Sequence, residues 1–188
     1  MKTAVVIPVR MGSSRFPGKP LANICGMPMV EHIYRRVSMA EGLEVYVATC
    51  DEEIKVAVEG FGGRVIMTAD THQRASERTA EAAESIDADV IVMVQGDEPL
   101  VHPEMVTLSA QPLLDDPSIV CSNLTSRIQS PQEFQDPSTI KVVMDREGFA
   151  LYFSRESIPT TGVQGFFDDS QVPIYKQVCV ISFRKDFL

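Results

Sequence analysis

The residues with the clearest capacity for chemistry lie in a short loop near the N-terminus, residues 10–20. Its cations and hydroxyl groups are Arg10, Arg15, Lys19, Ser13 and Ser14. Cations attract phosphate oxygens, and glycines let backbone N–H groups approach an anion closely. We therefore expect this loop to bind a phosphate-bearing ligand, with a solvated surface loop as the alternative. It is neither a Walker loop nor a dinucleotide fingerprint, because it lacks GxxxxGK[ST] and GxGxxG.

A second polar segment, Gln95-Gly96-Asp97-Glu98, follows the most apolar run of the chain, residues 89–94. Acids at that place either reach solvent or hold a cation, because an unpartnered charge is costly in a core. Mg²⁺ needs only one or two protein carboxylates beside the phosphates of a substrate. Asp97 suits that role, Glu98 is a weaker candidate, and a capped turn is the alternative. Together the two segments predict a site for a nucleoside triphosphate and its metal.

The elements that must position these loops alternate along the first part of the chain. Strands are expected at residues 3–8, 44–49, 64–67 and 89–94, and helices at 28–37, 51–61 and 76–86. Such alternation indicates a mostly parallel sheet with helices on both faces. Ligands of these sheets bind beyond the carboxyl ends of the strands. Both polar loops follow a strand, so we expect them to meet at that edge.

The second part of the chain has a different texture. Strands are expected at residues 119–127, 140–145, 150–154 and 175–184, with a short helix near 131–134. The sequence thus predicts one α/β domain over residues 1–188, with a β-rich second half. Glu77, Glu81 and Glu84 stand at near-helical spacing and are most simply a solvated face. For His72, a structural role and a substrate contact both stay open.

Composition limits the classes of partner. The 188 residues carry 17 Lys and Arg against 26 Asp and Glu, a net charge of −9. This balance argues against nucleic acid or an anionic membrane surface as a partner. No apolar run approaches the roughly 18 residues of a membrane-spanning helix, and the N-terminal run is too short for a signal peptide. We expect a soluble cytoplasmic protein. Its four scattered cysteines are expected to be free thiols.

Four motifs of this chain resemble a known family. They are Val6-Ile7-Pro8-Val9-Arg10, Ser13-Ser14-Arg15-Phe16-Pro17-Gly18-Lys19-Pro20-Leu21, Val94-Gln95-Gly96-Asp97-Glu98-Pro99 and Tyr152-Phe153-Ser154-Arg155. In this order they are similar to the cytidylyltransferases that activate 3-deoxy-manno-octulosonate (Kdo). The resemblance covers essentially the whole chain.

That resemblance implies an α/β nucleotidyltransferase fold, a Rossmann-like three-layer sandwich. It implies Mg²⁺-dependent transfer of CMP from CTP to a 3-deoxy-ulosonic sugar acid, Kdo or a relative, with release of pyrophosphate. A homodimer and a place in lipopolysaccharide biosynthesis are implied as well. Catalysis of this kind consists mainly of positioning and charge neutralisation, so no covalent protein nucleophile is required.

The resemblance also implies roles for individual residues. Arg10, Lys19 and Asp97 would be catalytic, with Asp97 as the Mg²⁺ ligand, and Gln95 would help to read cytosine or ribose. Arg155 would lie near the carboxylate of the sugar acid, and Gln177 would contact the substrate. The residues expected to contact the nucleotide are Arg10, Ser13, Ser14, Arg15, Lys19, Arg74, Ser76, Arg78 and Gln95.

Three departures from the family pattern change these expectations. Where the family has Ser-Gly-Thr-Asp/Glu-Arg, this chain has Arg74-Ala75-Ser76-Glu77-Arg78. Where family members place a histidine, a glycine and a tyrosine, it has Gln177, Cys179 and Ile181, so the acceptor need not be Kdo. Relatives also continue through a segment with a second magnesium-binding aspartate, which suggests that the chain is truncated. A sugar or polyol phosphate acceptor, or a binding module without turnover, are the alternatives.

Overall fold

The computed structural model describes residues 1–12, 16–159 and 173–188, which form two compact units. Unit 1 contains residues 1–122 and 179–188, and unit 2 contains residues 123–178. The prediction of one domain stays a prediction. Within the described residues, no helix has the length and apolar character needed to cross a membrane.

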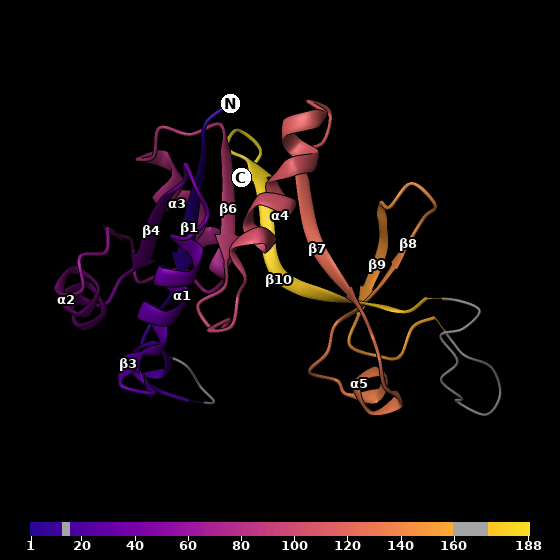
Figure 1. The fold of residues 1–188 in the computed structure, drawn as a ribbon, viewed down its shortest axis with the longest axis horizontal. Helices are drawn as coiled ribbons and strands as arrows, with labels where there is room; N and C mark the ends of the chain where they lie inside the picture. The colour runs from indigo at the N-terminus through magenta and orange to yellow at the C-terminus, as the bar shows by residue number, and fades with distance from the viewer. Residues whose placement is uncertain (13–15, 160–172) are drawn as a thin grey trace. The chain divides into compact units, whose positions relative to one another are not determined.

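Unit 1 is built on strands that alternate with helices, as the sequence predicts (Figure 1). Its strands are β1 (Thr3–Pro8), β4 (Glu44–Thr49), β5 (Val65–Met67), β6 (Val90–Val94) and the second part of β10 (Tyr175–Arg184). Its helices are α1 (Met29–Val37), α2 (Glu52–Gly60), α3 (Ala75–Glu84) and α4 (Pro103–Asp115). A 3₁₀ turn η1 (Lys19–Leu21) and a small hairpin of β2 (Asn23–Ile24) and β3 (Met27–Pro28) precede α1.

The strands of unit 1 pair in the order β5-β4-β1-β6-β10. β1 runs parallel to β4 and β6, and β4 runs parallel to β5, whereas β10 is antiparallel to β6. Successive side chains of a strand point to opposite faces of a sheet, yet every residue of β6 is buried. Both faces are therefore covered, which is why this strand shows no polar alternation.

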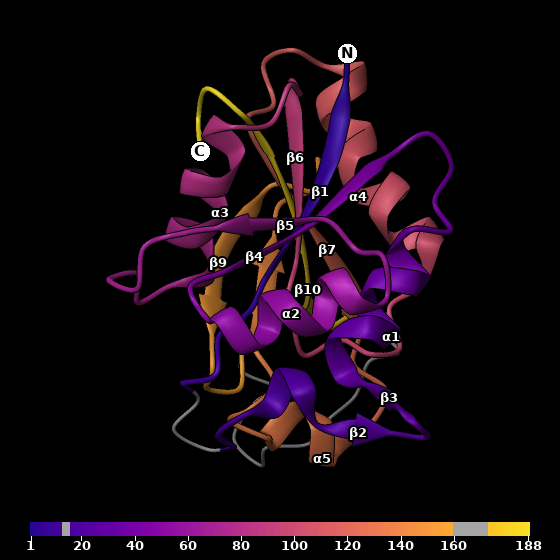
Figure 2. The same ribbon diagram turned by 90° about the vertical axis from the view of Figure 1, so that its left-hand side faces the viewer.

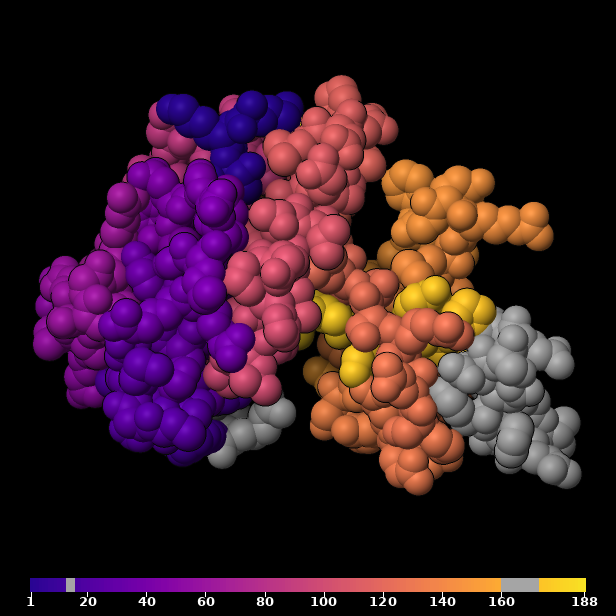
Figure 3. Space-filling view, viewed as in Figure 1, coloured from indigo at the N-terminus to yellow at the C-terminus, as the bar shows by residue number. Residues whose placement is uncertain are grey.

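Helices cover the two faces of this sheet. On one face Ala82, Ala83 and Ile86 of the α3 region form a core cluster with Ala4 and Val6 of β1 and with residues of β4 and β6. On the other face α4 packs on β6 and against α1 (Figure 2). The atoms of α4 lie directly beside those of the N-terminal third of the chain on the surface of unit 1 (Figure 3). This helix–sheet–helix arrangement confirms the predicted α/β class.

Unit 2 is the β-rich part. It contains most of β7 (Cys121–Arg127), α5 (Pro131–Gln135), β8 (Lys141–Met144), β9 (Ala150–Ser154) and the start of β10. β8 and β9 form an antiparallel hairpin, and β8 also pairs with the start of β10. Ile128, Phe134 and Ile174 form a small core.

The helix α4 is absent from the elements that the sequence predicted. Its buried residues Val106, Ser109, Ala110 and Leu113 follow helical spacing. A serine takes one of the four apolar positions, and Pro112 stands inside the helix. Both features weaken the apolar pattern of the segment. Ser109 is buried here because its hydroxyl bonds that of Ser182 on β10 at 2.7 Å.

Candidate functional site

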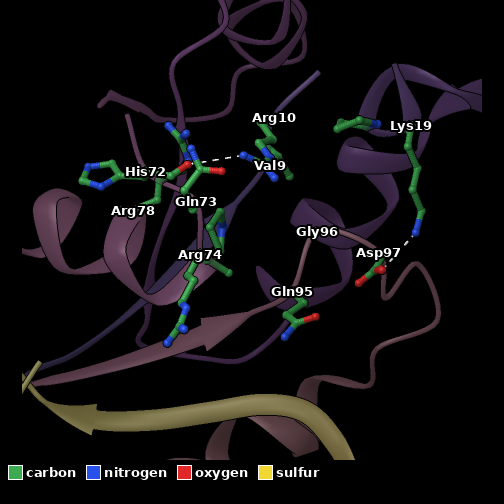
Figure 4. A pocket seen from close by; sticks show the side chains of 13 residues that line it. Val9, Arg10, Lys19, His72, Gln73, Arg74, Arg78, Gln95, Gly96 and Asp97 are labelled. Carbon is green, nitrogen blue, oxygen red and sulfur yellow. Dashed lines mark hydrogen bonds and ion pairs between the residues drawn. The ribbon is translucent and has the colours of Figure 1, made fainter. Parts of the chain in front are cut away.

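A cavity of about 420 Å³ lies where β1 and β6 end (Figure 4). The described residues that line it come from four segments: Pro8, Val9, Arg10, Lys19, Pro20, His72, Gln73, Arg74, Ala75, Arg78, Gln95, Gly96 and Asp97. Parallel neighbours β1 and β6 present their carboxyl ends at the same edge of the sheet. The loops that follow them therefore line one cavity, as the sequence predicts.

Lys19 and Asp97 point toward each other at one side of the cavity (Figure 4). Lys19 Nζ lies 2.9 Å from Asp97 Oδ2, and the two side chains are 31% and 40% exposed. Lys19 begins η1, while Asp97 follows β6. Both groups remain in reach of a ligand, because neither is buried by this contact.

Arg10 follows β1, and hydrogen bonds hold the backbone on both sides of it. Val9 N donates to Ala48 O at 3.0 Å, and Met11 N donates to Asp51 Oδ2 at 2.8 Å. The guanidinium donates from Nη1 to the backbone carbonyl of His72 at 3.3 Å. Arg10 thus enters the cavity from a fixed backbone.

The loop after β6 packs tightly against β1. A Cβ on Gly96 would overlap Val9 Cγ1 and lie 3.0 Å from Pro8 O, so this close approach requires glycine. Gln95 N donates to Cys179 O of β10 at 3.2 Å. Burial, followed by the nearby carboxylates of Glu98 and Asp97, raises the pKa of the Cys179 thiol to about 11.

The start of α3 supplies the remaining wall. Arg74 is exposed and lines the cavity. Arg78 is 3% exposed, and its guanidinium donates to Thr68 Oγ1, to Ala69 O at 3.3 Å and to Cys50 Sγ at 3.4 Å. These partners give Arg78 a structural function in the fold, and its predicted contact with the nucleotide stays a prediction. Ser76 lies in the first turn of α3 and does not line the cavity as the described residues form it.

Two of the predicted substrate residues belong to unit 2. Arg155 Nη1 donates to Pro137 O at 2.8 Å, and Gln177 Nε2 donates to Asn123 Oδ1. Ser13, Ser14 and Arg15 lie outside the described residues.

The glutamates predicted as a solvated face of α3 are exposed or partly exposed, but two of them also make hydrogen bonds that the sequence did not predict. Glu77 Oε2 accepts from Gln73 N at 2.8 Å and from Arg74 N at 3.0 Å. Glu81 accepts from Ala69 N and pairs with His72 Nε2. The bonds from Arg74 and Gln73 lower the pKa of Glu77, and the bond from His72, then that from Ala69, lowers the pKa of Glu81. These two glutamates therefore hold the loop before α3.

Sequence reasoning left Gln73 out of the site and left His72 open. Both line the cavity. Their place in the sequence could have predicted this, because they directly precede Arg74, a predicted site residue, in the loop that leads into α3.

The charges around the cavity suit a polyanion. Arg10, Lys19 and Arg74 contribute cations, and among the described lining residues Asp97 is the one acid. Within the described part of the chain, no group of three or more histidines, cysteines and acids gathers as a metal cage. Mg²⁺ binds readily through one or two carboxylates when substrate phosphates complete its shell. Asp97, half exposed at the cavity, fits such a site.

Comparison with known proteins identifies relatives over nearly the whole chain. The profile of the family described as "Cytidylyltransferase" matches residues 4–185. A relative from Geobacter metallireducens named 3-deoxy-manno-octulosonate cytidylyltransferase is 48% identical, over 100% of this chain and 77% of the relative. A protein of the same name from Francisella philomiragia is 40% identical over 98% of this chain and 75% of that protein.

Solved structures agree with the sequence relatives. CMP:2-keto-3-deoxy-manno-octonic acid synthetase complexed with CTP aligns with a TM-score of 0.90 at 40% identity, covering 99% of this chain and 75% of that one. A cytidylyltransferase from Leptospira borgpetersenii, at 19% identity and a TM-score of 0.63, shares the fold; the match covers 100% of this chain and 62% of that chain. The cavity at the ends of β1 and β6 and these matches lead to one conclusion: the chain belongs to the 3-deoxy-manno-octulosonate cytidylyltransferase family of enzymes.

Proposed function

We propose that this enzyme transfers CMP from CTP to Kdo or a related 3-deoxy-ulosonic acid, in a Mg²⁺-dependent reaction that releases pyrophosphate. The names of the relatives and the CTP complex of the similar structure support the substrates. The observation that carries the proposal is the meeting of Lys19 and Asp97 at the cavity, beside Arg10. Lys19 and Arg10 supply two cations for a triphosphate, and the Asp97 carboxylate supplies a ligand for its metal.

The chemistry needs little more from the protein than position and charge. A hydroxyl of the sugar acid attacks the α-phosphorus in line with the departing pyrophosphate, and negative charge develops on the leaving group. Lys19 and Arg10 would bind the triphosphate and stabilise this charge. Asp97 would hold Mg²⁺, which when bound neutralises phosphate charge. No residue forms a covalent bond to the substrate.

Further roles are part of the proposal. Gln95 would help to read cytosine or ribose, and Arg155 would bind the carboxylate of the sugar acid, with Gln177 as a second acceptor contact. The residues proposed to complete the nucleotide site are Ser13, Ser14, Arg15, Arg74, Ser76 and Arg78. We also propose a homodimer that acts in the cytoplasm, in lipopolysaccharide biosynthesis.

The test is a pyrophosphate-release assay with CTP and Kdo, with Mg²⁺ and with excess EDTA. We expect turnover with CTP and Mg²⁺, much lower turnover with ATP, GTP or UTP, and none with EDTA. Absence of pyrophosphate with every nucleotide would contradict the proposal.

A second set of acceptors tests the sugar site. Gln177 and Cys179 stand where the family has a histidine and a glycine, so related 3-deoxy-ulosonic acids are compared with Kdo. Sugar and polyol phosphates are included as well. Turnover only with a phosphorylated acceptor would assign the enzyme to a different acceptor class.

A further inference from the structure

The loop between β5 and α3 is tied to α3 by the carboxylate of Glu81. Ala69 N donates to both oxygens of this carboxylate, at 3.0 and 3.1 Å, and His72 Nε2 bonds Oε2. The His72 and Glu81 side chains are 21% and 36% exposed. One side chain therefore fixes the loop at two points, three residues apart.

The backbone of His72, held in this way, contacts Arg10 at the cavity. Its carbonyl accepts from Arg10 Nη1 at 3.3 Å. In Figure 4 the His72 ring lies on the side away from Arg10, while its carbonyl faces the guanidinium. The ring nitrogen Nε2 is already engaged by Glu81. The backbone carbonyl of His72, not its ring, therefore contacts Arg10.

An arginine side chain loses considerable rotamer entropy when it is held in one orientation. The backbone of Arg10 is fixed by the bonds of Val9 and Met11, but these bonds do not orient its guanidinium. The carbonyl of His72 does so before a ligand arrives, which reduces the entropy lost on binding.

We propose that Glu81 and His72 are positioning residues, which orient the Arg10 guanidinium for the phosphates of CTP. The inference rests on the proposed function, because it takes Arg10 as a phosphate ligand. It gives His72 and Glu81 an indirect role in nucleotide binding, through the orientation of Arg10.

The test is calorimetric titration with CTP and with CMP, which share the base and ribose but differ in the β- and γ-phosphates. The variants are R10A, H72A, E81A and the double variant R10A/H72A. E84A is the matched control, because Glu84 is an exposed acid on the same helix. The melting temperature of each variant shows whether it is folded.

We expect R10A to weaken CTP binding by about 10- to 100-fold, the loss typical of a hydrogen bond to a charged group. H72A and E81A should weaken CTP binding about three- to tenfold and CMP binding less, because part of the same interaction is lost. On the R10A background H72A should have no further effect. E84A should bind like the unmodified protein.

A conservative variant separates positioning from folding. Gln at position 72 carries an amide nitrogen that can donate to Glu81, so H72Q should restore most of the CTP affinity that H72A loses. H72Q also provides the comparison if H72A does not fold.

Four outcomes would overturn the inference. Unchanged CTP affinity in H72A and E81A beside a weakened R10A would leave Arg10 as a phosphate ligand and remove the positioning role. Equal losses for CTP and CMP, or losses that add to that of R10A, would do the same. An unchanged R10A would remove both the inference and the role of Arg10 in the proposed function.

Discussion

Lys19 Nζ lies 2.9 Å from Asp97 Oδ2, although 78 positions separate the two residues in the chain. Lys19 comes from the loop after β1, and Asp97 comes from the loop after β6. In this ion pair the charge of Lys19, the proposed phosphate ligand, neutralises the charge of Asp97, the proposed metal ligand. A nucleotide with its metal offers each partner a replacement charge, so ligand binding can separate them.

Asp97→Asn should abolish most of the Mg²⁺-dependent turnover and leave the fold intact. The change removes one charge with little change in volume, and we expect turnover to fall about 100-fold or more. Stability should change by less than about 1 kcal/mol, because a half-exposed ion pair contributes little. Initial rates and thermal unfolding measure the two effects. D186N, at an exposed aspartate, is the control, and unchanged turnover in D97N would contradict the metal role.

Lys19→Ala should lower kcat more than it raises the KM for the sugar acid. If Lys19 acts on charge that develops during phosphoryl transfer, its loss affects the transition state, and we expect about a 10- to 100-fold decrease in kcat. Steady-state kinetics with the acceptor varied at saturating CTP measures the split. K55A removes a lysine on α2 that pairs with Glu52 and should match the unmodified enzyme. A KM effect alone would contradict the role in the chemical step.

Gly96→Ala should destabilise the protein by about 1–3 kcal/mol, because the added methyl overlaps Val9 and must displace it. The loop that carries Asp97 would shift with it, so turnover should also fall. Urea unfolding gives the stability. The control G60A meets nothing within 4 Å at the end of α2 and should be neutral or stabilising by up to about 1 kcal/mol. Equal stabilities for the two variants would refute the packing argument.

Cys179 should resist alkylation at neutral pH. Its thiol pKa is raised to about 11, so only about one thiol in a thousand is ionised at pH 8. The alkylation rate of Cys179 should rise as the pH approaches 11, because a raised pKa means that the reactive thiolate forms only at higher pH. Iodoacetamide labelling with peptide mass spectrometry compares Cys179 with the exposed Cys25. Equal labelling of both at pH 8 would contradict the shift.

Lys141→Met should lower the free energy of unfolding by about 1–3 kcal/mol, the cost of leaving buried acceptors without a donor. Lys141 is fully buried in unit 2, and Nζ donates to Asp136 O at 2.7 Å, Thr139 O at 3.0 Å and Arg155 O at 2.9 Å. Urea unfolding tests this. The control replacement K55M, at a partly exposed lysine, should change stability by less than about 0.5 kcal/mol. A K141M as stable as the original chain would show that the carbonyls find other partners.

The sequence by itself determined the strands of the main sheet, three of the four helices of unit 1 and the edge at which the cavity forms, but not the small hairpin of β2 and β3. Apolar runs such as residues 90–94 identify buried strands, because a covered strand needs no polar alternation. The polar loops after β1 and β6 then predict the cavity, since parallel neighbours end at one edge. Local pattern was sufficient for these features.

Only the tertiary structure decided which side chains pair. Helical spacing alone makes Glu81 a solvated acid, yet it bonds the loop that carries His72. Arg78 is expected from the sequence to contact the nucleotide, and the structure buries it among partners from the segments that follow β4 and β5. These partners come from segments that are distant in the sequence. Burial removes water, so each buried polar group must form a hydrogen bond with a protein group that the fold brings close. That choice depends on the packing of the whole unit and is absent from local sequence pattern.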